Sequence, residues 1–407
     1  MKVLLCHNYY QQPGGEDRSF FDEEWLLKSH GHEVLRYTVH NDVIDGMSSV
    51  RLAKTLMWNQ ESYRELRELI QRERPAVMHC TNTFPLISPS VYYAAKRERV
   101  PVVQSLHNYR LLCPNALFLR NGKTCESCLG KSFPLPAIIH GCYRDSRVAS
   151  TGVATMLTFH RMMRTWTRVI DRYFVLTEFA RDKFIQGGLA ADRMVIKPNF
   201  VHPDTGPGDG SGDYAIFVGR LSSEKGVDTL LSAWEQLPSN TKLKVVGDGP
   251  LAGRVSQAMN DDPRIEWVGR RTKEEVDRLI HKASCLIMPS ICYETFGRAI
   301  IEAYVHGVPV IASRHGAMAE LVRHGETGLL FEAGNATQLR EAVERILRDP
   351  NKLLKMRRAA RSEFEQLYTA EVNYDLLIGT YRELIADTSV QHTPDSVRAI
   401  ARSTVKA

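Results

Sequence analysis

Short apolar runs alternate with amphipathic stretches along almost the whole chain. This alternation predicts an α/β fold in which parallel sheets carry helices on both faces. The runs expected to form strands in the first half are Lys2–His7, Glu33–Tyr37, Ala76–Cys80, Val102–Leu106, Tyr173–Leu176 and Met194–Ile196. Those in the second half are Ala215–Val218, Leu243–Val246, Ile265–Val268, Cys285–Met288, Val310–Ala312 and Gly328–Phe331. Each half therefore carries a nearly complete doubly wound pattern.

A segment rich in Pro and Gly, residues 201–212, separates the two halves and is expected to be a linker. With 407 residues and 43% hydrophobic content, the chain can fill two domain cores. We therefore expect an N-terminal domain over residues 1–200 and a C-terminal domain over 213–372. Because doubly wound sheets bind ligands outside the carboxyl ends of their strands, the site should lie in the cleft between the domains.

The end of the chain changes character. Residues 373–386 keep an apolar stripe at helical spacing, which predicts a packed helix. Residues 387–407 lose that periodicity and gain Ser, Thr, Arg and Lys, so we expect a mobile tail there.

Composition excludes several classes of protein. No run approaches the roughly 18 uncharged apolar residues of a membrane helix, and Met1–Cys6 looks like the start of a strand rather than a signal peptide. The net charge of +6 favours anionic substrates or an anionic membrane face without indicating nucleic acid. Eight cysteines, half of them in one short segment, do not resemble a secreted disulfide framework. A cytoplasmic protein is expected.

Two carboxylates bracket the stretch Glu294–Glu302, which lies between two expected strands and contains Gly297. Where a strand leads into a helix, the first amides of the helix are unpaired and suit an anion such as a diphosphate. The second carboxylate lies about 10 Å further along the helix than the first. The pair therefore suits different hydroxyls of one extended ligand, although two surface acids on an ordinary βαβ unit would look the same.

The second half opens with a strand that ends in Arg220 and runs into a turn carrying Lys225. A guanidinium binds phosphate bidentately and an ammonium acts as a point charge, so this turn suits a diphosphate. A solvated loop with two cations is the alternative interpretation.

In the first half, Gly14 and Gly15 follow the first strand and give a phosphate or sugar room to approach. The turn lacks the full dinucleotide fingerprint, which disfavours a conventional NAD site. His107 ends another strand of the same half and should face the proposed cleft. A tight turn and a structural histidine are the respective alternatives.

Taken in order, these features resemble the family 4 glycosyltransferases: the Gly-Gly turn, His107 after Val-Val-Gln-Ser-Leu, Val-Gly-Arg-Leu-x-x-Glu-Lys-Gly, and Glu-x7-Glu. The similarity spans residues 1 to about 385. It implies the GT-B architecture, with two Rossmann-like lobes and the donor sugar nucleotide held mainly by the second. The closing helix of that family crosses back to the first lobe, which here would be the helix at 373–386.

The resemblance also implies roles for individual residues. Arg220 and Lys225 would clamp the donor diphosphate, and Gly14, Gly15 and Glu16 would approach the substrate from the other side. Glu294 would bind donor-sugar hydroxyls and His107 would contact the same sugar. The residues with the remaining binding roles are Phe296, Gly297 and Arg298 through their amides, Glu302 at the ribose, and Gly269 and Arg270 near the base.

The reaction implied is retaining transfer from a nucleoside diphosphate sugar, with UDP or GDP as the nucleotide, to a hydroxyl acceptor. The acceptor would be lipid-linked or part of a cell-surface polysaccharide, and no metal would take part in catalysis. The leaving phosphate oxygen would take the proton of the acceptor, so the enzyme contributes positioning and electrostatics. A sugar-nucleotide 2-epimerase and a non-catalytic subunit that binds nucleotide sugar are the competing hypotheses.

An insert at about 108–145 carries four cysteines. They are Cys113, Cys125, Cys128 and Cys142. The Cys-x2-Cys knuckle predicts a structural tetrahedral zinc site, in which His140 could replace one thiolate. An iron–sulfur cluster and free or redox-active thiols are the alternatives.

The stretch Thr151–Ile170 mixes apolar residues with Arg161, Arg164 and Arg168. One interpretation is an interfacial helix that brings the enzyme to a lipid-linked acceptor at the membrane surface. The other is a domain helix with a buried apolar stripe and solvated arginines.

Overall fold

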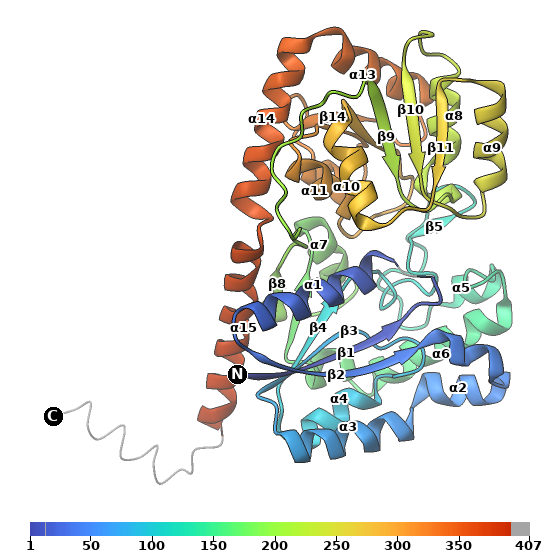
Figure 1. The fold of residues 1–407 in the computed structure, drawn as a ribbon. Coiled ribbons are helices and arrows are strands. Elements are labelled where there is room, and N and C mark those ends of the chain that lie inside the picture. Colours follow the sequence, from blue (N-terminus) through green and yellow to red (C-terminus); the bar gives the residue numbers. More distant parts are fainter. Residues whose placement is uncertain (13, 392–407) are drawn as a thin grey trace.

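The structure, a computed structural model, describes residues 1–12 and 14–391 as two α/β domains, one above the other in Figure 1. The N-terminal sheet has the order β2-β1-β3-β4-β7-β8, and all its strands are parallel. The strands are β1 (Lys2–Tyr9), β2 (Glu33–His40), β3 (Val77–Asn82), β4 (Val102–Leu106), β7 (Arg172–Val175) and β8 (Met194–Ile196). Every strand expected in the first half is present, with ends shifted by a few residues.

Helices cover both faces of this sheet. The helical segments are α1 (Gly15–Ser29), η1 (Asn41–Gly46), α2 (Ser49–Met57), α3 (Gln60–Glu73), α4 (Ser90–Arg97), α6 (Arg147–Met162), η2 (Thr165–Val169), α7 (Glu178–Gln186) and η3 (Ala191–Arg193). Alternate residues of β1 point to opposite faces. Leu4 and Cys6 join the apolar cluster under α2, α3, α4 and α6, whereas Val3 and Leu5 join the cluster under α1.

The C-terminal sheet has the order β11-β10-β9-β12-β13-β14 and is also parallel throughout. Its strands are β9 (Tyr214–Val218), β10 (Lys242–Val246), β11 (Ile265–Gly269), β12 (Cys285–Met288), β13 (Val310–Ser313) and β14 (Gly328–Phe331). Its helical segments are η4 (Ser223–Lys225), α8 (Val227–Trp234), α9 (Ala252–Asp261), α10 (Lys273–Lys282), α11 (Arg298–Val305), α12 (Ala317–Leu321), α13 (Ala336–Arg348) and α14 (Pro350–Leu367). The prediction of two doubly wound parallel sheets is confirmed.

Residues 197–213 connect the domains without forming a helix or strand. The linker is nevertheless held against α14, because Arg361 donates to both carboxylate oxygens of Asp204 at 2.7 Å. Arg357 also donates to the carbonyl oxygen of Gly208 at 2.8 Å.

The last described helix, α15 (Ala370–Gln391), leaves the C-terminal domain and runs along the N-terminal one (Figure 1). Leu377, Ile378 and Tyr381 enter the apolar cluster under α1. The expectation of a tail from residue 387 is wrong as far as Gln391, because helix propagation adds a backbone hydrogen bond per residue whether or not the side chains are apolar. Residues 392–407 of that expected tail lie outside the described residues.

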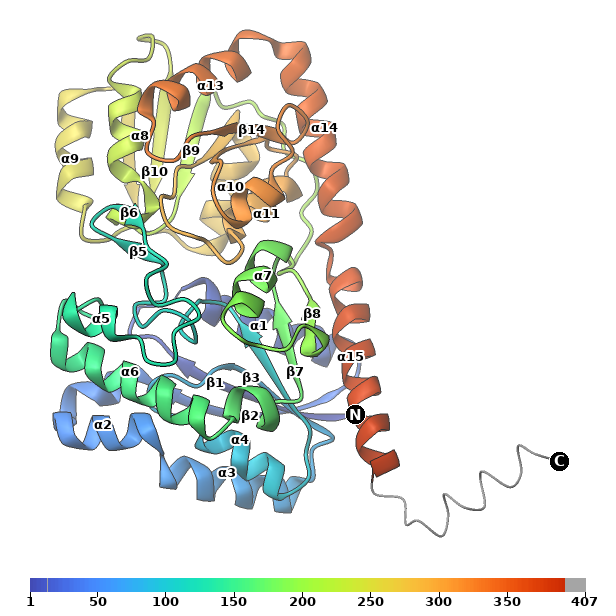
Figure 2. The ribbon, with the colours of Figure 1, turned by 180° about the vertical axis from the view of Figure 1, so that it is seen from behind.

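The cysteine-rich insert between β4 and α6 contains the hairpin β5 (Leu119–Arg120) and β6 (Lys123–Thr124) and the helix α5 (Leu135–Ile139). Figure 2 shows the hairpin reaching up to the C-terminal domain. There Thr124 Oγ1 lies 3.0 Å from His315 Nε2. The insert therefore closes one side of the space between the domains.

Candidate active site

The cleft edge of the C-terminal sheet brings Lys225 and Glu294 together. Lys225 ends η4, just after β9, and Glu294 lies in the loop after β12, the strand paired with β9. Lys225 Nζ donates to Glu294 Oε1 at 2.6 Å, and Ser290 Oγ donates to the same oxygen at 2.8 Å. Two motif residues that are distant in sequence thus form one charge-paired unit.

The ammonium of this pair is fixed in its charged state. Burial alone would lower the pKa of Lys225, but the Glu294 carboxylate outweighs it and the net shift is upward. Lys225 is therefore a permanent cation at physiological pH, and it can neutralise a second anion near Glu294.

Arg220 lies just after β9 and is exposed, and it forms no ion pair within the described residues. It shares a loop with Lys225, as the sequence predicts. Gly269 ends β11 and Arg270 follows it, at the sheet edge, separated from β12 by β10 and β9. Only an extended ligand would reach from Glu294 to that edge.

Two glycines bring the turns of the site close to β12. Gly226 has φ 71°, and a Cβ there would lie 1.9 Å from the carbonyl oxygen of Pro289. Gly297 has φ 93°, and a Cβ would lie 2.9 Å from Met288 Cε. At Gly226 any other residue would clash with the backbone, and at Gly297 the positive φ would strain any other residue.

The helix α11 begins at Arg298, so the amides of Arg298 and Ala299 lack intrahelical acceptors and favour an anion, whereas the Ile300 amide donates to the Gly297 carbonyl at 2.9 Å. Phe296 is buried and packs against Tyr368, with ring centroids 6.0 Å apart. Because its side chain is in the core, only its backbone is free to meet a ligand.

The side chain of Arg298 bridges the two domains. Its Nη2 donates to Asp22 on α1 at 2.5 Å and its Nε donates to Glu302 at 2.9 Å. Burial alone would lower the pKa of Arg298, but Asp22 and Glu302 raise it overall. Glu302, predicted to bind a ribose, is therefore already held by a buried cation.

Across the cleft, Gly14 precedes α1, and its amide donates to Asp17 at 2.8 Å. A Cβ at Gly14 or Gly15 would meet nothing within 4 Å, so the turn leaves room for a ligand. Glu16 accepts from Tyr10 at 2.7 Å and from Asn108 at 3.3 Å. Burial raises the pKa of Glu16 despite these hydrogen bonds.

His107 follows β4 and meets the C-terminal domain directly. Thr295 Oγ1 donates to the His107 carbonyl oxygen at 2.7 Å, which holds the histidine next to the Glu294 loop. Burial lowers the pKa of His107 to about 3, so the imidazole is neutral at physiological pH. Its Nε2 is buried and has no hydrogen-bond partner among the described residues, as expected of an atom that meets a ligand.

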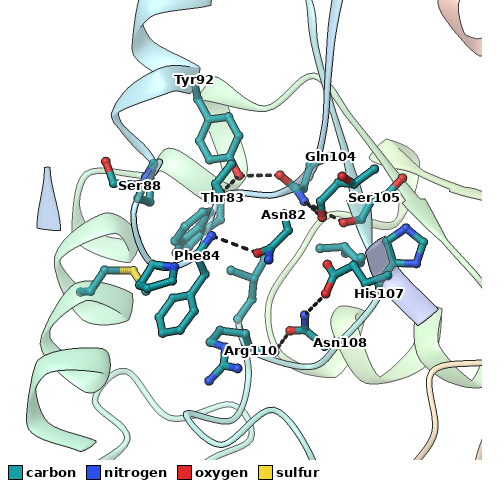
Figure 3. A pocket seen from close by; sticks show the side chains of 18 of the residues that line it. Asn82, Thr83, Phe84, Ser88, Tyr92, Gln104, Ser105, His107, Asn108 and Arg110 are labelled. Carbon is teal, nitrogen blue, oxygen red and sulfur yellow. Dashed lines mark hydrogen bonds between the residues drawn. The ribbon is translucent and has the colours of Figure 1, made fainter. Parts of the chain in front are cut away.

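A small pocket of about 60 Å³ opens beside His107, between the loops that follow β3 and β4 (Figure 3). Its polar lining includes Asn82 and Asn108. Phe84 and, from the helices beneath, Met156 and Trp166 supply apolar surface. This space can admit a small group of a second substrate next to the residues that face the C-terminal domain.

The four cysteines of the insert are free thiols, with Cys113 and Cys128 buried and the other two partly exposed. Burial raises the pKa of Cys128 to about 11, and the charges of Cys113, Cys142 and Cys125 add to this rise, so the four lie in one region. Within residues 1–12 and 14–391, no group of three or more His, Cys, Asp or Glu side chains is arranged to hold a metal ion. The metal content of the protein is not tested by this arrangement of side chains, so the zinc site and the iron–sulfur alternative stay predictions.

The basic amphipathic stretch is not one helix. Helix α6 ends at Met162, Arg164 takes φ 57°, and the distorted turn η2 follows. Val153, Met156 and Leu157 are buried, whereas Phe159 and Met162 are exposed. No helix in the described part of the chain has the length and apolar character to cross a membrane.

Sequence reasoning missed Asp22 and Arg110. Asp22 pairs with a residue 276 positions away, and nothing in a single sequence signals such a contact. Arg110 lies three positions after His107 and lines the pocket. The rule that ligands meet the carboxyl ends of parallel strands would have directed attention to it.

Comparisons with known proteins agree with this geometry. The model for glycosyl transferases group 1 matches residues 206–363, and the glycosyl transferase 4-like domain matches residues 26–199. An uncharacterized glycosyltransferase of Methanocaldococcus jannaschii is 31% identical over 355 residues, which are 85% of this chain and 88% of that protein. The sulfoquinovosyl transferase of Arabidopsis thaliana is 23% identical over 362 residues, 84% of this chain and 65% of that protein.

Two solved structures share the fold. Anabaena HepE in complex with UDP has a TM-score of 0.67 at 18% identity, covering 94% of this chain and all (100%) of its own. Sucrose-phosphate synthase of Thermosynechococcus elongatus has a TM-score of 0.70 at 18% identity, covering 95% of this chain and 100% of its own. Given the two domain matches, the long alignment and two facing parallel-sheet domains, this chain belongs to the family 4 glycosyltransferases and has the GT-B fold.

Proposed function

We propose that this glycosyltransferase moves a sugar from a nucleoside diphosphate donor to a hydroxyl of a lipid-linked or polysaccharide acceptor, with retention of configuration. The observation that carries the proposal is the Lys225–Glu294 pair, 2.6 Å apart, next to the unpaired Arg220 and the start of α11. The solved complexes of HepE with UDP and with UDP-glucose support a sugar nucleotide as donor.

In this proposal the C-terminal side of the cleft binds the donor. Arg220 and Lys225 neutralise the diphosphate, and the charge that develops on it as the glycosidic bond breaks is met by groups already in place. Glu294, fixed by Lys225 and Ser290, accepts hydrogen bonds from donor-sugar hydroxyls. Glu302 binds the ribose, and the loop of Gly269 and Arg270 lies near the base.

The N-terminal side presents the acceptor. His107 contacts the donor sugar as a neutral imidazole, because burial keeps its pKa at about 3. The acceptor oxygen approaches the anomeric carbon from the face that the diphosphate leaves, and the departing phosphate oxygen takes its proton. Product stereochemistry, read by the anomeric NMR coupling of the transferred sugar, tests retention.

We propose that Arg220 and Lys225 neutralise the charge of the donor diphosphate without a divalent cation. Both can lie beside a diphosphate bound at α11, and guanidinium and ammonium together offset most of its charge. Turnover in EDTA equal to turnover in magnesium is the expected result. A dependence on added divalent cation would reject this part of the proposal.

A peripheral contact with the inner face of the cell membrane is proposed on the surface of α5 and α6. Exposed apolar side chains gather on these two helices, which pack on each other. They are Phe133, just before α5, Leu135, Ile139, Phe159, Met162 and Met163. Arg161 and Arg164 supply positive charge nearby, which suits anionic lipid. Co-sedimentation with anionic vesicles should exceed that with neutral vesicles, and equal binding to both would count against this contact.

The decisive experiment is a panel of UDP-, GDP- and ADP-sugars, read by thermal shift and then by nucleotide release with and without a lipid extract. One donor that stabilises the protein and releases nucleotide faster with acceptor supports transfer. Conversion of the donor to its 2-epimer without acceptor would establish the epimerase instead. A donor that binds but is never consumed would favour a binding subunit.

A further inference from the structure

The pocket beside His107 contains a cation that has no counter-ion. Among the residues that line it, Arg110 is the cation with a permanent charge. Its Nη1 donates to the carbonyl oxygen of Pro114 at 2.6 Å. Within the described part of the chain no carboxylate lies at ion-pair distance, and neither Nε nor Nη2 donates to a protein acceptor.

Aromatic rings hold this guanidinium in place. Its central carbon lies 4.3 Å from the ring centroid of Phe84 and 5.2 Å from that of Tyr143. Figure 3 shows Arg110 near Phe84 and Asn108. Stacking on rings orders the planar fork and removes water from its faces, while the in-plane N–H groups stay available for a ligand.

Three cations around the cleft that are not exposed have carboxylate partners, whereas Arg220 and Arg270 are exposed and form no ion pair among the described residues. Lys225 pairs with Glu294 at 2.6 Å, and the buried Lys197 pairs with Glu23 at 2.7 Å. Arg298 pairs with Asp22, which also pairs with Arg18. A half-buried charge without a partner is costly, so the unpaired state of Arg110 indicates that the missing anion comes from a ligand.

The carboxylate at the pocket rim does not supply this anion. Glu16 lines the same pocket, but its carboxylate accepts hydrogen bonds from Tyr10 and Asn108. Asn108 lies between the two charges, because its Nδ2 donates to Glu16 and its Oδ1 accepts from the backbone amide of Arg110 at 3.0 Å. The pocket thus offers a carboxylate for hydroxyls at one place and a guanidinium for an anion at another.

We propose that the acceptor is an anionic saccharide, carrying a phosphate or carboxylate group, and that Arg110 binds this group and sets acceptor specificity. This inference rests on the proposed function, since it presumes sugar transfer at His107. The fork of Arg110 binds the anion bidentately. Phe84, Met156 and Trp166 pack against the less polar part of the acceptor, and its hydroxyl lies toward His107.

Two sources of such an anion are distinguished by experiment: the diphosphate of a lipid-linked sugar and the carboxylate of a uronic acid. The acceptors used are an alkyl glucoside, the matching alkyl glucuronide, and a short prenyl-diphosphate-linked N-acetylglucosamine. Rates are measured with the wild type, Arg110→Gln and Arg110→Lys. Arg144→Gln is the matched control, because Arg144 also lies over Tyr143, at 5.7 Å, but is exposed and does not line the pocket.

The wild type should use one anionic acceptor at least about tenfold better than the neutral glucoside, as one charge-assisted contact implies. Arg110→Gln should remove this preference by raising the acceptor KM, while the donor KM stays the same. Arg110→Lys should restore part of it, and Arg144→Gln should behave as the wild type.

Equal use of neutral and anionic acceptors by the wild type would overturn the inference, as would an Arg110→Gln effect on donor KM. If no acceptor is turned over, calorimetric titration of the same compounds with UDP present decides, and absence of anion-dependent binding is again negative. Failure of the proposed function has a different signature, since then the wild type would convert a nucleotide sugar without acceptor, bind one without consuming it, or bind none.

Discussion

The two sides of the cleft are lined by different kinds of residues. On the C-terminal side, charged side chains stand at strand ends in short motifs, and the site is open: Arg220 is exposed and Lys225 reaches Glu294 across two loops. On the N-terminal side, a mixed pocket is enclosed by loops and helices, and its charged groups are half-buried, with His107 neutral. Binding of a nucleoside diphosphate requires cationic side chains held in fixed positions, whereas an acceptor is selected by the shape of its pocket and by a few polar contacts. The comparison therefore predicts that changes in the C-terminal motifs alter the use of the donor, and that changes in the N-terminal pocket, apart from His107, alter the use of the acceptor.

The largest effect is expected at the charged pair. Glu294→Ala and Lys225→Ala should each lower the rate of transfer by about 10²–10³-fold, since each removes a group placed for the transition state. Steady-state kinetics with the identified donor gives the measurement. Lys244→Ala is the control, because Lys244 forms a pair of the same length, 2.6 Å, with Glu266 outside the site. Near-normal turnover in either site variant would reject the assignment.

The next effect concerns His107. His107→Gln should slow transfer about tenfold to a hundredfold, the cost of one or two hydrogen bonds. Because burial lowers the pKa of His107 from 6.5 to about 3, the wild-type rate should show no histidine inflection near pH 6.5. An inflection there that disappears in His107→Gln would show that the imidazole titrates in the working range.

The same lowered pKa has a consequence for stability. As the pH falls below 6.5, His107 becomes protonated in the unfolded chain but stays neutral in the folded protein. The folded state therefore loses stability as the pH falls from 6.5 to about 3. His107→Gln should therefore show a smaller drop in Tm over this range than the wild type. An identical drop in both proteins would place the titration elsewhere.

A smaller effect should follow at Glu302. Glu302→Ala should raise the donor KM about tenfold, as expected for loss of a hydrogen bond to a charged group, and leave the acceptor KM unchanged. The measurement is a KM determination with each substrate varied in turn. A change in the acceptor KM alone would break the division between the two sides, since Glu302 also holds Arg298, which bridges to α1.

The smallest effect on catalysis is expected at the cysteines. Metal analysis of purified protein should find about one equivalent of zinc if the four thiolates bind it as a structural ion. Replacing all four cysteines by serine should then lower Tm by a few degrees and change the rate little. Less than about a tenth of an equivalent of zinc or iron would reject a metal site.

The sequence allowed the fold to be predicted because buried parallel strands are short apolar runs that stand out from their surroundings. The same rule located Arg220, Lys225 and Glu294 at the cleft, since strand ends fix where a loop lies even when the loop itself is irregular. The end of α15 was misjudged at residue 387 because a last helical turn needs no apolar stripe.

The sequence alone could not predict which side chains pair with each other. Motif spacing does not say that Glu294 is held by Lys225 and Ser290, nor that Arg298 turns away to meet Asp22. These depend on which loops face each other after both domains fold. The isolation of Arg110 is of the same kind, because a missing partner can be recognised only when all neighbours are placed.

The course of α15 has a consequence for biosynthesis. Tyr381 donates or accepts a hydrogen bond with the buried His79 at 2.7 Å, and Leu377 and Ile378 fill the cluster under α1. The domain that leaves the ribosome first is therefore completed by residues that follow the whole C-terminal domain in the sequence. Until α15 has been synthesised, the apolar cluster under α1 lacks part of its cover, and exposed apolar surface makes a nascent chain prone to aggregate. Cutting the gene at the linker would leave the first half permanently in that unfinished state.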